Sequence, residues 1–327
     1  MVAKLPEGLE LAGYRIVKKI ASGGFSIVYL AYDALGNAVA IKEYLPSALA
    51  SRQEGELAPT VAPANQPLFR LGLKSFFEEG RALAKIAHPN VVRVLNFFRA
   101  NDTVYMVMAY ESGHTLQEQI ARQRGSEAKS AGKIGEAFIR QVFIQILNGL
   151  REVHANGLLH LDLKPANIYL RSDGTPLLLD FGAARHAIDS GALTLNPMYT
   201  PGFAAPELTF KTSPLGPWTD AYGIGAAMFT CMAGAPPQPA EERRKQDRMA
   251  EHFTQLAGRY SPELVQLVRR ALALDPSARP QSLFEMQKLL RAPWVPVAPP
   301  RPAGRLARLR ALARRLRPGR PLDTLQG

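Results

Sequence analysis

The 327-residue chain begins with strand patterns and continues with helical ones. Three early runs carry apolar residues at alternating positions: "YRIVKKIA", "FSIVYLAYD" and "AVAIKEYL". Turn residues at Gly23-Gly24 and Gly36-Asn37 separate these runs, so the pattern predicts three antiparallel strands. A later segment, "VVRVLNFFRANDTVYMVMAYE", predicts a hairpin around Asn101-Asp102.

Apolar residues at helical spacing predict one helix within this first part, in "LGLKSFFEEGRALAKIA". After Gly113 a long amphipathic helix follows in "EAFIRQVFIQILNGLREVHANG", and further helices are predicted over 219–233, 262–274 and 281–291. The sequence therefore predicts an α+β protein over residues 10–292. We expect a small antiparallel β lobe with one helix (10–109), a larger mainly helical lobe (114–292), and a cleft between them.

Two segments do not fit this pattern. Residues 46–68 are rich in Pro, Ala and polar residues and indicate an insert in the small lobe. Its aromatic exit favours an ordered or semi-ordered insert that packs near the following helix, whereas its composition is equally typical of a floppy surface loop. Residues 293–327 form a Pro- and Arg-rich tail. Its eight arginines and one acid, Asp323, supply +7 of the net charge of +12.

Composition narrows the setting in which the protein works. The N-terminus, "MVAKLPEGLELAGY", has no continuous apolar run, so we expect no signal peptide. The least polar window, 221–235, is shorter than the roughly 20 apolar residues that span a bilayer. A single cysteine, Cys231, excludes an internal disulfide and fits a reducing compartment. We expect a cytoplasmic protein, with peripheral attachment to the inner membrane surface as a variant of that location.

Candidate chemistry centres on "LLHLDLKPANIYL", residues 158–170. Four polar side chains lie close together in an otherwise apolar segment, which indicates a site: His160, Asp162, Lys164 and Asn167. Other distinctive segments stand before and after it, in the order "ASGGFSIVY", "VAIKEY", "LLLDFG", "YTPGFAAPE" and "DPSARP". The six histidines show no metal-ligand spacing.

This ordered set of motifs resembles the eukaryotic-like (Hanks-type) serine/threonine protein kinases, in a bacterial form. The resemblance covers about residues 10–292. It implies the two-lobed kinase fold and the transfer of the γ-phosphoryl group of ATP to Ser and Thr hydroxyls of proteins, including autophosphorylation. ATP and Mg²⁺ are the implied cofactors, with Mn²⁺ as an alternative metal.

The resemblance also implies catalytic roles. Asp162 would orient the attacking hydroxyl and accept its proton, and Lys164 would neutralise charge on the γ-phosphoryl. Lys42 would contact the α- and β-phosphates and would be fixed by a carboxylate of the following helix. That carboxylate is Glu79 by spacing, with Glu78 second. The remaining implied residues bind Asp162 or the metal: Thr200, Asn167 and Asp180.

Nucleotide contacts follow from the same resemblance. The glycine-rich turn would approach the phosphates through Ala21, Gly23 and Gly24, although the family's three glycines fall here at Ala21, Gly23 and Ser26. Val28 and Ala40 would form the roof over the adenine ring, and Tyr169 would form the floor. Met108 would be the gatekeeper, and backbone groups of Ala109 and Glu111 would pair with the edge of the base.

Structural pairs are implied as well. Glu207 would form a buried ion pair with Arg279, and Asp220 would accept hydrogen bonds from the catalytic-loop backbone. His160 would stack on Phe181 in a hydrophobic column completed by Leu83 and Val94.

One position departs from the family pattern. Most of these kinases have an arginine before the catalytic aspartate, and it receives a phosphate on the activation segment. Leu161 stands there instead. We therefore expect an activity that does not depend strongly on phosphorylation at Ser190, Thr194 or Tyr199.

Two further alternatives stay open. A kinase-shaped scaffold or binding module without catalysis competes with an active kinase, and the complete set of Lys42, Glu79, Asp162, Asn167 and Asp180 favours activity. In the tail, four leucines among arginines fit a basic amphipathic helix that meets an anionic membrane surface or an acidic partner, against disorder as an equal alternative: Leu306, Leu309, Leu312 and Leu316. Nucleic acid is not expected, because residues 301–320 contain no aromatic side chain.

Overall fold

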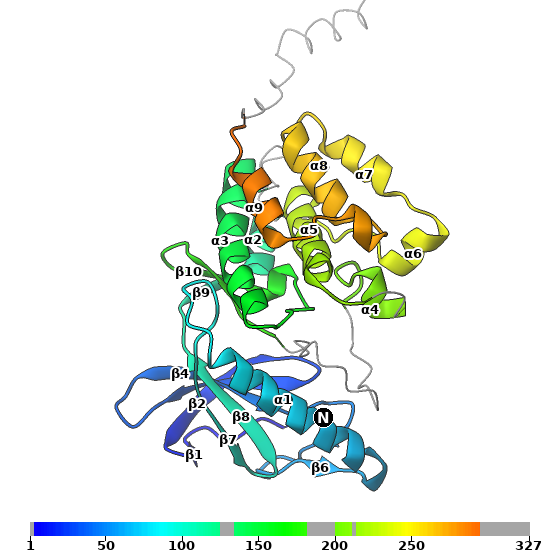
Figure 1. The fold of residues 1–327 in the computed structure, drawn as a ribbon. Coiled ribbons are helices and arrows are strands. Elements are labelled where there is room, and N and C mark those ends of the chain that lie inside the picture. The colour runs from blue at the N-terminus through cyan, green and yellow to red at the C-terminus, as the bar shows by residue number, and fades with distance from the viewer. Residues whose placement is uncertain (1–2, 125–133, 182–199, 211–213, 295–327) are drawn as a thin grey trace, which may run out of the picture.

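The structure, a computed structural model, describes residues 3–124, 134–181, 200–210 and 214–294. The chain forms a small lobe, drawn from blue to cyan, and a larger helical lobe, drawn from green to orange (Figure 1). Strands fill the first part and helices dominate the second. The expected α+β, two-lobed fold is confirmed.

The small lobe is built on a six-stranded antiparallel sheet with the strand order β1-β2-β3-β4-β8-β7. Its strands are β1 (Glu10–Leu11), β2 (Tyr14–Ser22), β3 (Ser26–Tyr32), β4 (Ala38–Tyr44), β7 (Val94–Ala100) and β8 (Thr103–Ala109). Asn101 and Asp102 join β7 to β8 with φ angles of 49° and 54°. Two successive positive φ angles are typical of the turn that matches the twist of a two-residue hairpin.

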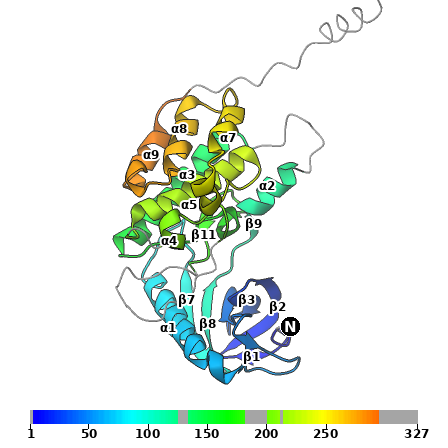
Figure 2. The same cartoon turned by 90° about the vertical axis from the view of Figure 1, so that its right-hand side faces the viewer.

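Helix α1 (Gln66–Leu83) packs against β7 and β8, as Figure 2 shows. It begins five residues earlier than the apolar pattern predicts, so residues 66–68 of the expected insert belong to the helix. Pro67 lies in its first turn, where a missing backbone N–H costs no intrahelical hydrogen bond. The rest of the insert contains β5 (Ala50–Ser51), β6 (Thr60–Val61) and the 3₁₀ turn η1 (Pro63–Asn65).

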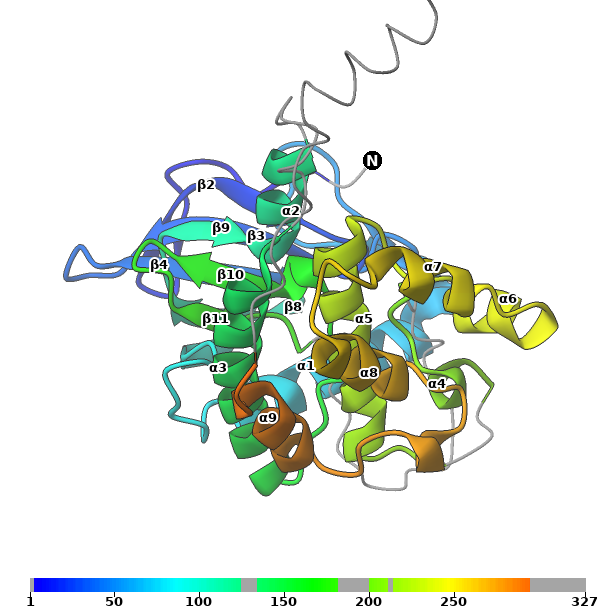
Figure 3. The same ribbon diagram turned by 90° about the horizontal axis from the view of Figure 1, so that it is seen from above.

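In the large lobe, α5 (Pro217–Ala233) is buried along most of its length and packs against α3, α8 and α9. A helix that is apolar all round belongs in the middle of a core, and Figure 3 shows the other helices around it. These are α2 (Leu116–Arg124), α3 (Glu136–Ala155), α4 (Pro206–Phe210), α6 (Ala240–Lys245), α7 (Met249–Leu256), α8 (Pro262–Ala271) and α9 (Leu283–Arg291).

Smaller elements complete this lobe. A three-stranded sheet, β11-β10-β9, faces the small lobe and is formed by β9 (Gly113–Thr115), β10 (Ile168–Arg171) and β11 (Pro176–Leu178). Two 3₁₀ turns are η2 (Pro165–Asn167) and η3 (Pro276–Ala278). Among the described helices, none is both long and apolar enough to cross a membrane.

A buried ion pair ties the chain after η3 to α4. Arg279 donates from Nη1 and Nη2 to the two carboxylate oxygens of Glu207 at 2.6 and 2.9 Å, and both side chains are fully buried. The predicted Glu207–Arg279 pair is therefore confirmed. Its two-point geometry compensates for the loss of water around both charges.

Candidate active site

The loop that carries Asp162 is held by a carboxylate at the start of α5. Asp220 accepts hydrogen bonds from the backbone amides of His160 and Leu161 at 2.9 and 2.8 Å. This arrangement confirms the contact expected of Asp220. Leu161 is buried and has a φ of 62°, a left-handed conformation that is unfavourable for a residue with a Cβ.

Sequence reasoning missed the third partner of this carboxylate. His154, in the last turn of α3, places Nε2 2.7 Å from Oδ2 of Asp220. Burial alone would raise the pKa of Asp220, but the hydrogen bond and charge of His154, with the contacts to His160, lower it. Asp220 is therefore an ionised acceptor. The one signal in the sequence was a histidine at the end of an amphipathic helix, which is too common to single out.

Four of the predicted site residues meet around one carboxylate. Oδ2 of Asp162 accepts hydrogen bonds from Nζ of Lys164 at 2.7 Å and from Nδ2 of Asn167 at 3.0 Å. Lys164 also donates to Oγ1 of Thr200 at 3.0 Å, and Thr200 lies 3.5 Å from Oδ1 of Asp162. All four residues of this cluster belong to the large lobe. It holds the Asp162 carboxylate in one orientation while about a quarter of the side chain stays exposed.

A second group joins the two lobes. Lys42, on β4, forms an ion pair with Asp180, which follows β11. Burial alone would lower the pKa of Lys42, but the charges of Asp180 and Glu79 raise it above its usual value. The amine therefore remains protonated.

Glu79, on α1, lies near Lys42, and the structure distinguishes it from the adjacent candidate, Glu78. Glu79 is buried, whereas Glu78 is exposed and lies near Lys74. In the described part of the chain, no hydrogen bond or close ion pair joins Glu79 to Lys42. Burial, only partly offset by the charge of Lys42, raises the pKa of Glu79 to about 8. Lys42 is thus paired with Asp180 in this arrangement, and Glu79 is a nearby carboxyl group that keeps its proton at neutral pH.

Asn167 and Asp180 could hold a metal ion together with phosphates. The backbone N–H of Leu179 donates to the carbonyl oxygen of Asn167 at 3.0 Å, which brings the following residue, Asp180, beside Asn167. Nδ2 of Asn167 is used by Asp162, and the side-chain oxygen is the atom that suits a hard cation. The described residues contain no group of three or more His, Cys, Asp or Glu that could form a cage. Mg²⁺ commonly binds one or two protein oxygens plus substrate phosphates, so this donor set fits it.

The residues expected to form the adenine roof share the face of the sheet that carries Lys42. Val28 pairs with Lys42 across β3 and β4, and Ala40 lies two residues before Lys42, so all three point to one side. Ala40 pairs in turn with Met108 on β8. The expected roof and gatekeeper are therefore neighbours.

Tyr169, the expected floor of the adenine site, lies on β10, which is bonded to Glu111 in the segment between the lobes. The Tyr169 hydroxyl donates to the carbonyl oxygen of Glu111 at 3.2 Å, and Arg171 forms an ion pair with the Glu111 carboxylate at 2.9 Å. The backbone N–H of Ala109 donates to the carbonyl of Arg93 at 3.0 Å. A base in this place would meet other backbone atoms of this segment, because the Glu111 carbonyl and the Ala109 N–H are already used.

The turn between β2 and β3 is hydrogen-bonded to the chain that follows β4. The backbone amide of Ser47 donates to the carbonyl of Gly24 at 2.9 Å, and that of Leu45 donates to Phe25 at 2.8 Å. Gly23 also bonds to Ser26 across the turn at 2.9 Å. The backbone of the predicted phosphate-binding turn is therefore held in place at its tip.

His160 is a core histidine, as expected. Its ring contacts that of Phe181 with centroids 4.4 Å apart, but the planes are tilted by 36° and not stacked as expected, and the side chain is fully buried. Burial lowers the pKa of His160, so the ring is neutral at pH 7. Leu83 and Val94 belong to the same buried core.

Several predicted features lie outside the described residues. These are Ser190, Thr194 and Tyr199, the glycine after Phe181, and the tail beyond Trp294.

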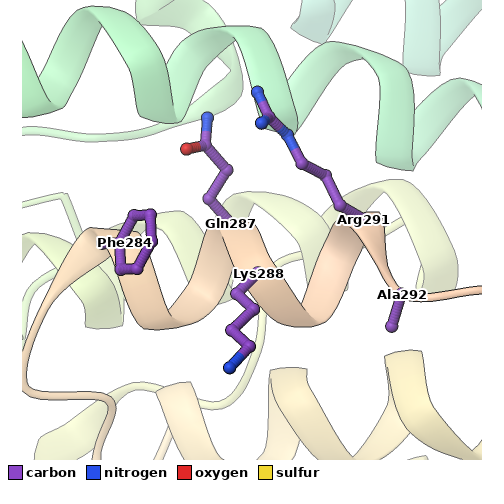
Figure 4. Close-up of a pocket in the computed structure, with 5 residues that line it drawn as sticks. All are labelled: Phe284, Gln287, Lys288, Arg291 and Ala292. Atoms are coloured by element: carbon purple, nitrogen blue, oxygen red, sulfur yellow. The ribbon is translucent and has the colours of Figure 1, made fainter.

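One shallow pocket of about 320 Å³ lies elsewhere, on α9, and is lined by Phe284, Gln287, Lys288, Arg291 and Ala292 (Figure 4). None of the site residues lines it.

Comparison with known proteins agrees with this geometry. The chain is 29% identical over 303 residues to the serine/threonine-protein kinase PknK of Mycobacterium tuberculosis, covering 89% of this chain and 24% of PknK. It is 26% identical to the serine/threonine-protein kinase B of Synechocystis, covering 87% of this chain and 47% of that protein. The chain thus spans about a quarter to a half of the length of these curated relatives.

Solved structures show the same fold. The apo form of PpkA-294 is 37% identical, with a TM-score of 0.75 over 88% of this chain and 99% of that one. The PknI kinase domain of Mycobacterium tuberculosis is 21% identical, with a TM-score of 0.61 over 88% of this chain and 98% of that one. The family model for the protein kinase domain matches residues 14–295. The chain belongs to the protein kinase domain family.

Proposed function

We propose that this protein is a serine/threonine kinase that transfers the γ-phosphoryl group of ATP to hydroxyls of protein substrates, including its own. The observation that carries the proposal is a pair of side-chain groups, one within the large lobe and one that joins the two lobes. Asp162, Lys164 and Thr200 form one, and Lys42 with Asp180 forms the other. Phosphoryl transfer is catalysed mainly by positioning and charge stabilisation, and these two groups supply both.

In the large lobe, Asp162 acts on the acceptor. Its carboxylate is held by Lys164 and Asn167 and can accept a hydrogen bond from a substrate hydroxyl and then its proton. Lys164 lies beside it as a fixed positive charge that compensates charge on the group in transfer. Thr200 binds Lys164 and so restricts the ammonium group to one place.

In the small lobe, Lys42 binds the phosphates and Glu79 is the carboxylate available to fix it when Asp180 binds metal. Asn167 and Asp180 would hold Mg²⁺ or Mn²⁺, which neutralises phosphate charge when bound. Nucleotide binding is assigned to the turn and sheet residues already placed on this face and to the segment between the lobes: Ala21, Gly23, Gly24, Val28, Ala40, Met108, Ala109, Glu111 and Tyr169.

The basic tail, residues 293–327, suggests where in the cell the protein acts. Its arginines and spaced leucines support binding to an anionic membrane surface or an acidic partner, by a protein that works in the cytoplasm.

Labelled ATP tests the activity. Wild-type protein with Mg²⁺ should label itself or a general protein substrate on Ser and Thr, as mapped by mass spectrometry. Asp162→Asn and Asp180→Ala should each lose nearly all labelling and still unfold cooperatively. Asp173→Asn, in an exposed turn after β10, is the matched control and should label normally. Labelling that survives in Asp162→Asn, or that falls on tyrosine, contradicts the proposal.

A further inference from the structure

β4 is buried on both of its faces, which is unusual for an antiparallel sheet in a two-layer lobe. Every residue from Val39 to Tyr44 is buried. Side chains alternate along a strand, so Lys42 points toward Asp180 and Glu43 points to the opposite face of the sheet. The face opposite Lys42 is therefore also covered, and the Glu43 carboxylate is buried beneath that cover.

Glu43 is held by a complete set of donors. Its Oε1 accepts hydrogen bonds from Nη1 of Arg52 at 2.5 Å and from the Tyr105 hydroxyl at 2.8 Å. Its Oε2 accepts from Nη2 of Arg52 at 2.8 Å and from the Tyr29 hydroxyl at 2.9 Å. The exposed fractions of Glu43, Tyr29 and Tyr105 are 0%, and that of Arg52 is 1%. One fully buried carboxylate thus joins β3, β4 and β8.

Arg52 comes from the insert and reaches further than Glu43. Its Nε donates to the carbonyl of Ala3 at 3.0 Å, and Nη1 also donates to the carbonyl of Leu57 at 3.2 Å. The backbone amide of Ala3 returns a hydrogen bond to the carbonyl of Arg52 at 3.0 Å. A single guanidinium therefore fastens the N-terminal segment and the insert to the back of β4.

The two tyrosines act as neutral donors in this cluster. Burial, followed by the charge of Glu43, raises the pKa of Tyr29 and of Tyr105. Both hydroxyls keep their protons at neutral pH. The cluster then contains one negative and one positive charge, so its geometry rather than an excess of charge holds it together.

The insert also touches the nucleotide side of the lobe. Ser47 donates from its backbone amide and from its hydroxyl to the carbonyl of Gly24, in the glycine-rich turn. Arg52 lies five residues after Ser47. Two short routes therefore connect Arg52 to the site, one through Glu43 to its neighbour Lys42 and one along the chain to Ser47 and from there to Gly24.

We propose that Arg52 is a positioning residue for phosphoryl transfer, because its fork to Glu43, Ala3 and Leu57 fixes Lys42 and the glycine-rich turn from behind the sheet. The proposal rests on the proposed kinase function. The insert is then a working part of the nucleotide site and not only a surface loop. A lysine cannot replace the arginine, since a single ammonium group lacks the planar fork that meets these acceptors together.

The chain offers a matched control for this test. Arg140, on α3 in the large lobe, is another buried arginine, and it binds Glu136 at 2.7 Å, the carbonyl of Leu290 at 2.8 Å and Ser261 at 3.1 Å. It has the same chemistry and no contact with the residues of the site. Arg140→Lys therefore measures the general cost of losing a buried guanidinium fork.

The experiment compares Arg52→Lys with Arg140→Lys in the full chain, by steady-state kinetics with varied ATP and by calorimetric binding of a non-hydrolysable ATP analogue with Mg²⁺. Arg52→Lys should lower kcat/KM for ATP by roughly tenfold or more, with a raised KM, because a shift of about 1 Å in a positioned group can cost roughly 100-fold. Arg140→Lys should keep KM for ATP within about twofold of wild type, because distant sites without shared partners act independently. Loss of folded protein alone would lower the apparent kcat and leave KM unchanged.

A double variant distinguishes the loss of positioning from the effect of leaving the Glu43 charge buried without its partner. Glu43→Gln with Arg52→Met removes both charges and leaves an amide that the two tyrosines can still bind. It should also raise KM for ATP and weaken binding of the analogue, and it decides the matter if Arg52→Lys does not fold. Wild-type KM in this double variant, or an equal rise in KM in Arg140→Lys, overturns the proposal. A wild type that binds the analogue but transfers no phosphate would instead contradict the kinase function, and analogue affinities would still report on Arg52.

Discussion

The backbone amide of Leu161 donates a hydrogen bond to Oδ1 of Asp220 at 2.8 Å, while Leu161 holds a φ of 62°. A left-handed conformation costs a residue with a Cβ about 1–2 kcal/mol. The buried carboxylate offsets this cost by also binding the amide of His160 at 2.9 Å. Asp162 comes directly after these two residues, so the orientation of the proposed catalytic carboxylate depends on Asp220.

Asp220→Asn should therefore damage both stability and activity. The amide has one acceptor oxygen, so at least one of the two backbone N–H groups loses its buried partner. We expect a loss of about 2–4 kcal/mol in the free energy of unfolding, measured by urea denaturation, since a broken buried charge contact leaves its partners unsatisfied. The kcat for phosphorylation should fall as well.

Asp247→Asn is the control for this substitution. Asp247 accepts hydrogen bonds from Arg243 in the large lobe, and its side chain is 40% exposed. It should cost much less stability and leave kcat unchanged. Equal stability losses in the two variants, with kcat unchanged in both, would show that Asp220 has no special relation to the catalytic loop.

The buried carboxyl of Glu79 predicts a specific pH dependence of stability. Its pKa of about 8 in the folded protein lies above the ordinary value of 4.5. Between these two values the unfolded chain has lost a proton that the folded protein keeps, so Glu79 makes the protein less stable as pH rises from about 4.5 to 8. Glu79→Gln should remove this effect. Its unfolding free energy relative to wild type should increase over that range by an amount on the order of a few kcal/mol, since each pKa unit is worth about 1.4 kcal/mol.

Glu78→Gln is the matched comparison, because Glu78 is the exposed neighbour on the same helix. Denaturation at several pH values should show a nearly constant difference from wild type for this variant. A constant difference for Glu79→Gln too would mean that Glu79 is ionised in the folded protein throughout the range. Activity gives an independent check, because only Glu79→Gln should reduce phosphorylation.

The residue before Asp162 bears on control by phosphorylation. Leu161 is a buried apolar side chain, so this position supplies no cation for a phosphate on the activation segment. Ser190→Ala and Thr194→Ala should each retain most of the wild-type activity. Thr200→Ala should lose most of it, because Thr200 binds Lys164 beside Asp162. Initial rates of peptide phosphorylation measure all three, and a loss in Ser190→Ala or Thr194→Ala as deep as that of Thr200→Ala would refute the leucine argument.

The basic tail can be tested by vesicle binding. Full-length protein should bind vesicles that contain anionic lipid, and its affinity should fall with added salt because surface charges are screened. A variant that ends at Trp294 should lose binding and keep activity. The shortened chain keeps Trp294 because its ring packs against Arg140, 5.1 Å from the guanidinium. If the full-length protein does not bind anionic vesicles at all, the membrane hypothesis fails.

Much of the fold was determined by the local pattern of the sequence. Alternating apolar positions predicted the strands around Lys42 and the hairpin at Asn101-Asp102, and helical spacing predicted α3 and α5. These patterns are reliable because each element buries one face, and the period of that face is set by the backbone geometry. Motif order predicted Asp162, Asn167 and Asp180 as one group because the resemblance supplied their spacing, and the structure brings them close together.

Tertiary structure decided which charged groups meet. Glu78 and Glu79 are adjacent in sequence, and only the packing of α1 on the sheet buries one of them. The pairing of Lys42 with Asp180 joins residues 138 positions apart. Glu43 and Arg52 are only nine residues apart, yet an irregular segment connects them, and its path is set by hydrogen bonds to Ala3 and Gly24. No short-range pattern encodes such a path, because its direction depends on partners that are distant along the chain.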